Sequence, residues 1–246
     1  MPAFKYDLHI HSCLSPCGSD DMTPNNIAGM AMLNGVQIAA LTDHNTAKNC
    51  PAFFSACRRY GVIPIPGMEL TTQEEIHMVC LFPSLEAAMK FDEFLDSHRM
   101  KIKNRPKIFG NQLILNDEDE VIGEDEYLLI TATDLELTAA ANAVREHGGV
   151  PFPAHIEKSA NSVLAMLGLF PEEPAFTAAE IHDMSKLDSI RKMNPILDSL
   201  KIISDSDAHQ LDTLPFDLPE IELDCDPNDE NSVRNALISY LSVGKK

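Results

Sequence analysis

The sequence predicts an α/β fold built on a parallel sheet, either open or closed into a barrel. Short apolar runs of β-prone residues alternate along the chain with helical-looking stretches, which is the pattern of repeated strand–helix units. Hydrophobic residues make up 44% of the 246 residues and charged residues 23%, which are ordinary values for a globular protein. Residues 1–246 are therefore expected to form a single domain, with a short acidic excursion at about residues 100–128.

The strand candidates are runs that are far shorter than the roughly 20 residues a membrane helix needs. In chain order they are Lys5–Ile10, Gln37–Thr42, Val62–Pro66, Ile76–Phe82, Gly149–Pro153, Ala178–Ile181 and Lys201–Ser204.

The helix candidates carry recognisable start and stop signals. Thr23 offers an N-cap with Pro24 at the first helical position, and Gly35 ends that helix. The segment Thr133–Glu136 has the pattern of a capping box ahead of a helix that ends near Gly148. Two further amphipathic stretches are predicted as helices, Ser84–His98 and Asn228–Val243.

Composition restricts the partners and the compartment. The chain holds 38 acidic and 19 basic residues, a net charge of −19, so we expect neither a membrane surface nor long nucleic acid as a partner. It has no Trp and only 6% aromatic residues, which also disfavours a groove that stacks bases. Six dispersed cysteines without a CxxC pair indicate reduced thiols and a cytoplasmic protein, and the oligomeric state stays open.

Metal-ligand residue types follow nearly every strand candidate. In α/β folds the carboxyl ends of parallel strands meet at one edge, where ligands and catalysis gather. The residues at these ends are His9, His11, Asp43, His44, Glu69, His155, His182, Asp183, Asp205, Asp207 and His209.

His9 and His11 are two residues apart on a strand, so both imidazoles project from the same face. Two adjacent imidazoles suit a divalent cation better than a core, where each would need a hydrogen-bond partner. The number of nitrogen and oxygen donors exceeds the capacity of one ion, so two or three ions are expected. This donor mixture suits zinc, manganese or iron and argues against calcium.

The ordered motifs are HIH, TDH, GMEL, a downstream histidine, PAH and SDSDAH, and together they resemble the PHP (polymerase and histidinol phosphatase) family of metal-dependent phosphoesterases. The resemblance extends from Asp7 to His209. It implies a single PHP-type domain with a distorted TIM-like (β/α)7 barrel and a metal site at the C-terminal ends of the strands.

The resemblance also implies a ligand set. His9, His11 and Asp207 would hold one ion, Glu69 would bridge to a second ion, and the remaining ligands are His77 and His155 for the second ion and His44 and His209 for a third. Many three-metal members have a further histidine shortly after the first pair. Here Cys17 stands at that place, with Asp20 as an alternative. A thiolate would favour zinc or ferrous iron.

The implied activity is hydrolysis of a phosphate ester by a hydroxide that bridges two or three divalent ions. Asp43 and His209 are the candidates for catalytic roles, and Asp43 would either orient an imidazole or receive a proton. Lys158, Arg105 and His182 are the candidates for substrate contacts.

The expected substrate is a small phosphorylated metabolite or a nucleotide. One alternative is a metal-dependent amidohydrolase, although those enzymes use a lysine-derived bridge where this chain has Glu69. The other alternative is a non-catalytic, regulatory PHP module.

Overall fold

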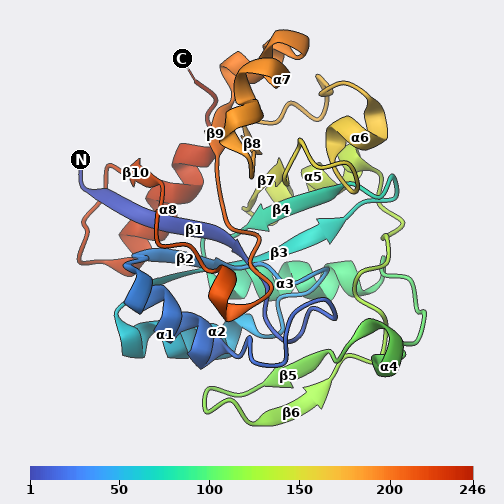
Figure 1. Ribbon diagram of the computed structural model, residues 1–246, viewed down its shortest axis with the longest axis vertical. Helices are drawn as coiled ribbons and strands as arrows, with labels where there is room; N and C mark the ends of the chain where they lie inside the picture. Colours follow the sequence, from blue (N-terminus) through green and yellow to red (C-terminus); the bar gives the residue numbers. More distant parts are fainter. Residues whose placement is uncertain (246) are drawn as a thin grey trace.

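The computed structural model describes residues 1–245, and its main sheet follows the order β10-β1-β2-β3-β4-β7 (Figure 1). The three strands β1, β2 and β3 are parallel neighbours, with Ile38 opposite Tyr6 and Ile63. The bounds of the sheet strands are β1 Ala3–Ile10, β2 Ile38–Leu41, β3 Ile63–Thr71, β4 His77–Leu81, β7 Val150–Pro153 and β10 Glu220–Glu222.

The sheet is mixed rather than wholly parallel, because β10 runs antiparallel to β1 and because β4 reverses direction. A turn in which the Thr72 amide donates to the Ile76 carbonyl at 2.9 Å joins β3 to β4, and this connection is too short for a parallel crossover. β4 therefore runs antiparallel to both β3 and β7. The first residue of β4, His77, consequently lies at the same edge as the carboxyl ends of β3 and β7.

A parallel pair, β8 Ala178–Glu180 and β9 Lys201–Ile203, continues the curl of the sheet. The Ile156 amide, just after β7, donates to the Glu180 carbonyl, and His11, just after β1, donates to the Ala208 carbonyl. The strands thus curl into a half-barrel that approaches closure between β9 and β1. The predicted α/β, TIM-like architecture is confirmed, and all seven predicted strand runs form strands.

Helices cover both faces of the curled sheet. Their bounds are α1 Pro24–Asn34, α2 Cys50–Tyr60, α3 Leu85–Asp96, α4 Pro106–Phe109, α5 Leu137–Glu146, α6 Val163–Leu167, α7 Leu187–Met193 and α8 Glu230–Leu241, with 3-10 turns η1 Met184–Lys186, η2 Pro195–Ser199 and η3 Leu211–Thr213. Phe53 of α2 and Phe91 of α3 are fully buried in a cluster on one face, and Leu237 of α8 belongs to a second cluster with Leu8 of β1. Burial of these apolar side chains is the main force that holds the barrel together.

One predicted helix start is confirmed and another is wrong. Thr23 caps α1 by accepting from the Asn26 amide, as expected. The capping box at Thr133–Glu136 is wrong, since α5 has Glu136 itself as N-cap, without a side-chain cap bond. The Thr133 hydroxyl instead donates to the Thr71 carbonyl, because this segment is tied to the end of β3.

The excursion between α3 and α5 contains α4 and a hairpin of β5 Leu113–Leu115 and β6 Val121–Glu124, which projects at the lower end of the molecule in Figure 1. It rests against the loop that follows β1, where the Leu113 amide donates to the Cys13 carbonyl at 3.0 Å. Its basic residues are mostly ion-paired, as in Arg99 with Asp125 at 3.0 Å. Whether residues 1–246 form one domain stays a prediction. No helix within residues 1–245 combines the length and apolar character that crossing a bilayer demands.

Replacing Thr23 by Ala should lower the free energy of unfolding by about 1–2 kcal/mol, because α1 loses its N-cap and the hydroxyl that donates to Asp119 at 2.5 Å. Thr23→Ser should recover most of this stability, since it keeps the hydroxyl. Chemical denaturation of the three proteins measures the effect. Equal stability of Thr23→Ala and the unchanged protein would contradict it.

Candidate metal centre

Six segments bring imidazoles and carboxylates to one edge of the barrel. His9 and His11 lie at the end of β1, His44 follows β2, Glu69 lies in β3, and the other members are His77 at the start of β4, His155 after β7, and Asp207 and His209 after β9. The fold thus gathers the predicted histidines and carboxylates from positions that are up to 200 residues apart in the chain.

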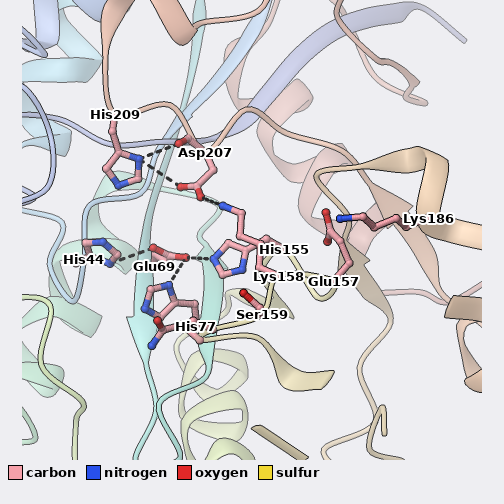
Figure 2. A pocket seen from close by; sticks show the side chains of 12 residues that line it. His44, Glu69, His77, His155, Glu157, Lys158, Ser159, Lys186, Asp207 and His209 are labelled. Carbon is pink, nitrogen blue, oxygen red and sulfur yellow. Dashed lines mark hydrogen bonds and ion pairs between the residues drawn. The ribbon is translucent and has the colours of Figure 1, made fainter. Parts of the chain in front are cut away.

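Glu69 is the centre of this arrangement. Its side chain is buried, and its two carboxylate oxygens lie 2.9–3.3 Å from nitrogens of five imidazoles, those of His9, His11, His44, His77 and His155. Figure 2 shows His44, His77 and His155 arranged around it. A buried carboxylate shared by so many neutral ligand types is suited to bridge two cations.

The hydrogen bonds that His9 and His11 make through Nδ1 leave their facing Nε2 atoms as the nitrogens available to a metal ion. His9 Nδ1 donates to the Glu180 carboxylate at 2.7 Å. His11 Nδ1 donates to Ser15 Oγ at 2.9 Å, because the Ser15 hydroxyl proton is used on Asp43. The two Nε2 atoms face each other at 3.1 Å, an arrangement that a cation between them would stabilise in place of protons. The residues present therefore fit a divalent metal ion.

The potential ligand atoms fall into three groups in which all atoms lie within 4.8 Å of one another. These groups are His9, His11, Glu69 and Asp207; His44, Glu69 and His77; and His11, His44 and His209. Buried Asp207 Oδ1 and His44 Nδ1 make no hydrogen bond among residues 1–245, which leaves both atoms available as ligands. Three overlapping groups match an expectation of more than one ion. The individual ligand assignments stay predictions.

The electrostatics divide these residues into charged and neutral sets. Burial alone would raise the pKa of Glu69, but the positive charges of His77 and His9 hold it well below its usual value. Burial, reinforced by His11 and His77, lowers the pKa of His44 to about 3. Burial and His11 likewise lower the pKa of His209 to about 4. His44 and His209 are therefore neutral imidazoles near neutral pH, the form that binds metal.

Two of the edge residues adopt a strained backbone. His155 has φ 28° and Asp207 has φ 52°, both in the left-handed region that non-glycine residues rarely enter. Such conformations cost about 1–3 kcal/mol each and persist where surrounding contacts determine them. Here the strain turns both side chains toward Glu69 and His9.

Residues of the centre line a cavity of about 530 Å³, and the side chains that line it are drawn in Figure 2. Its walls include His44, His77 and His209 on one side and two lysines, Lys158 and Lys186, on the other. Lys158 reaches Asp207 and forms an ion pair with its Oδ2 at 2.5 Å. The cavity therefore joins ligand atoms to cationic groups, the combination that an anionic substrate requires.

Three other candidate residues from the sequence, Asp43, Cys17 and Asp20, are not among the residues that line this cavity. Asp43 is buried and accepts from the Ser12 amide and from the hydroxyls of Ser12 and Ser15. Through Ser15 it holds His11, an arrangement that favours its orienting role. Cys17 is exposed and belongs to none of the three ligand groups, and Asp20 accepts from Asn111. Their roles as ligands stay predictions.

Two proposed substrate contacts lie outside the walls of this cavity. Arg105 is exposed at the start of α4, where its guanidinium lies 5.8 Å from the centre of the Phe109 ring. His182 lines a different cavity, and its Nδ1 donates to the Asp205 carbonyl at 3.3 Å. Only Lys158 of the three lies beside the centre. The contacts of Arg105 and His182 with substrate stay predictions.

Sequence reasoning missed Glu180. This carboxylate is fully buried at the end of β8 and fixes the orientation and tautomer of His9. The available signal was a single acid inside the otherwise apolar run Ala178–Ile181, but its partner lies 171 residues away in the chain.

A family profile described as the PHP domain matches residues 7–143, more than half of the chain. The chain belongs to the PHP family. The resemblance inferred from the ordered motifs is thereby confirmed.

Individual relatives share parts of the chain or its fold. A protein of Haemophilus influenzae described as a 5'-3' exoribonuclease is 35% identical over 80 residues, which are 31% of this chain and 28% of that relative. The lesion-specific endonuclease Q of Pyrococcus furiosus has a TM-score of 0.67 at 20% identity, covering 99% of this chain and 57% of its own. A putative metal-dependent phosphoesterase of Bifidobacterium adolescentis has a TM-score of 0.58 at 18% identity and is covered to 96%, as is this chain.

The expected partner, a small molecule with long nucleic acid excluded, is a prediction that these neighbours overturn. Endonuclease Q has been solved with a 27-mer duplex substrate that carries an abasic lesion at its active site, and that structure matches 99% of this chain with a TM-score of 0.62. The fold therefore accommodates nucleic acid. The net charge of −19 is a property of the whole surface, whereas cations and lysines set the local potential at a phosphate-binding site.

Replacing Glu180 by Gln should weaken metal binding at the His9 position about 10- to 100-fold, because His9 loses the charged acceptor that fixes its tautomer. Competition with a chromogenic chelator measures this affinity. Glu172→Gln, at an exposed position, is the matched control and should bind metal normally. Unchanged affinity in Glu180→Gln, with normal thermal unfolding, would show that Glu180 does not position His9.

Proposed function

We propose that this protein hydrolyses phosphodiester bonds of RNA from a strand end at the centre built around Glu69. The observation that carries this proposal is the cavity of about 530 Å³ in which the ligand groups and Lys158 face the same space. That volume suits a group of nucleotide size, which favours a strand terminus over the middle of a duplex.

The proposal assigns the divalent ions, zinc, manganese or iron, to the three overlapping ligand groups. Ions bound there supply Lewis-acid stabilisation of a phosphoryl group and a nucleophile at neutral pH. His9 and His11 point their Nε2 atoms at this place, while Glu180, Ser15 and Asp43 keep the imidazoles from turning. The protein thus orients its ligands before substrate arrives, which removes reorganisation from the reaction.

Lys158 is the residue best placed to bind the phosphate. Its ammonium lies at the cavity wall and forms an ion pair with Oδ2 of Asp207. A non-bridging phosphate oxygen at this place would accept a hydrogen bond from the same ammonium. His209, whose Nδ1 donates to the Asp207 carbonyl at 2.8 Å, keeps its Nε2 free toward the cavity.

A cavity next to the central one provides space for the rest of the RNA strand. Asn161 borders both the central cavity and an adjoining cavity of about 490 Å³, whose walls include the exposed Met100 and Ile130 and the buried Thr133. Apolar side chains beside backbone polar groups suit a nucleoside next to the reacting phosphate. The similarity to a 5'-3' exoribonuclease over 80 residues supports the choice of RNA and of a terminal cleavage site.

The direct test is cleavage of a 3'-labelled single-stranded RNA oligonucleotide by protein loaded with Mn²⁺ or Zn²⁺. We expect stepwise release of short products, arrest by a chelator, and a loss of at least about a thousandfold in His9→Ala. Elemental analysis of the same samples shows whether His9→Ala has lost an ion.

Parallel assays separate the alternatives. Faster cleavage of single-stranded DNA or of duplex DNA than of RNA would contradict the RNA assignment. Hydrolysis of amide substrates alone would make the protein an amidohydrolase, and bound metal with no turnover of any substrate would indicate a regulatory module.

Lys158→Ala should raise KM for the RNA substrate about tenfold or more, because a charge-assisted hydrogen bond to phosphate is lost. Lys90→Ala removes an exposed lysine of α3 and is the matched control, for which KM should not change. Steady-state kinetics at saturating metal measure both. A fall in metal content without a change in KM would instead make Lys158 a residue that acts through Asp207.

A further inference from the structure

Asn45 is a buried polar residue that directly follows His44 of the metal centre. It is 1% exposed, and its backbone has φ 52°, in the left-handed region. Its backbone amide donates to the Glu69 carbonyl at 2.9 Å, and His44 and Glu69 form a parallel backbone bridge. The backbone of His44 and Asn45 is therefore fixed to β3, the strand that carries Glu69.

The side chain of Asn45 joins the end of β3 to the excursion between α3 and α5. Its Oδ1 accepts from the Thr71 amide at 2.9 Å, two residues beyond Glu69. Its Nδ2 donates to the Leu129 carbonyl at 2.7 Å and to the Thr131 carbonyl at 2.9 Å. Asparagine tolerates the left-handed region, and its carboxamide supplies an acceptor together with two donor hydrogens. Both properties are used at this position.

The two carbonyls that Asn45 holds lie on either side of a residue of the adjoining cavity. Ile130 and Thr131 line that cavity of about 490 Å³, as does Asn161, which also lines the central cavity. Ile130 is 36% exposed, whereas Leu129 is buried. Asn45 therefore anchors the wall of the adjoining cavity from behind, on both sides of Ile130.

Within residues 1–245, the other hydrogen bonds of residues 128–131 stay inside the excursion. The Leu129 amide donates to Gln112 Oε1 at 2.9 Å, and the Thr131 amide donates to the Leu128 carbonyl at 3.4 Å. The next attachment to β3 is at Thr133, whose amide and hydroxyl both donate to the Thr71 carbonyl. Asn45 is thus the hydrogen-bonded link between this stretch of wall and the metal centre.

We propose that Asn45 is a positioning residue for the substrate strand, which holds the wall of the adjoining cavity at a fixed place relative to the metal centre. The inference rests on the function proposed above, in which the reacting phosphate lies in the central cavity and the neighbouring nucleoside in the adjoining one. Phosphate and nucleoside are covalently joined, so the two cavities must keep their spacing for both groups to be bound at once. Asn45 is bonded to both sides of that spacing.

Asn45→Gly isolates this role, because glycine keeps the left-handed backbone and the amide bond to Glu69 while all three side-chain hydrogen bonds are lost. We expect the amides of residues 128–133 to exchange with solvent about tenfold faster or more. Hydrogen exchange followed by mass spectrometry measures this without any substrate. The metal content should stay unchanged in elemental analysis, because His44 keeps its backbone bridge to Glu69.

Asn194→Gly is the matched control. This asparagine is also buried, accepts from the Phe170 amide at 2.8 Å and donates to the Ile190 carbonyl at 3.1 Å. It lines neither the central nor the adjoining cavity. Its substitution should lower stability without changing exchange at residues 128–133. Asn45→Ser keeps one donor, so it should give a smaller effect of the same kind, and it provides the test if Asn45→Gly does not fold.

Kinetics separate positioning of the strand from damage to the centre. For the RNA oligonucleotide, Asn45→Gly should lower kcat/KM about tenfold or more, mainly through a rise in KM, because binding of the nucleoside is lost. Bis(p-nitrophenyl) phosphate is a diester without a nucleoside, so its kcat/KM should not change. Asn194→Gly should leave kcat/KM unchanged for both substrates.

Three results would overturn the proposal. The first is exchange at residues 128–133 that is equal in Asn45→Gly and the unchanged protein. The second is faster exchange without a change in kcat/KM for RNA, which would make the role of Asn45 structural only. The third is an equal loss for RNA and the small diester together with loss of metal, which would show that Asn45 acts on His44 instead.

Failure of the function proposed above gives a different result. In that case the unchanged protein does not cleave RNA, whereas hydrogen exchange in Asn45→Gly still decides whether Asn45 holds the wall of the adjoining cavity.

Discussion

The structure depends on a buried carboxylate that five imidazoles surround. Glu69 is 1% exposed, and a charge so far from water persists only with compensating partners. Those partners come from β1, β4 and the segments after β2 and β7. The sheet must therefore curve for all five imidazoles to reach the charge of Glu69. His155 and Asp207 adopt left-handed backbone conformations that bring their side chains to this centre. The reversed direction of β4 likewise brings His77 to it.

Much of this arrangement could be predicted from residue type and order. Apolar runs gave the strands, and the ligand types at their ends gave the edge where the centre lies, because both signals are local. The direction of β4 could not be read from its run, since it depends on the turn at Thr72–Ile76. The role of Glu180 could not be predicted, because it depends on a contact with His9, which is distant in the chain. The capping box predicted at Thr133 does not form, because the Thr133 hydroxyl bonds to the Thr71 carbonyl instead.

Net charge proved a poor guide to partners. The acidic residues that dominate the composition are spread over exposed helices and loops and over ion pairs such as Lys48 with Asp125. The potential felt by a substrate is determined instead by the few groups that line the cavity, where Lys158 and Lys186 lie beside the ligand clusters. Composition averages over the surface, whereas recognition takes place within a few ångströms.

The way the barrel closes has a consequence for its motions. The strands β1, β2 and β3 are joined by continuous ladders, which open only when much of the sheet unfolds. Between β1 and the segment after β9, the amides of Leu8 and Ser206 rely on single side-chain acceptors. These amide protons should exchange with solvent through a small local opening, long before those of β2. Where the barrel meets itself, side-chain acceptors thus replace part of the backbone ladder, so we expect local opening to begin there before global unfolding.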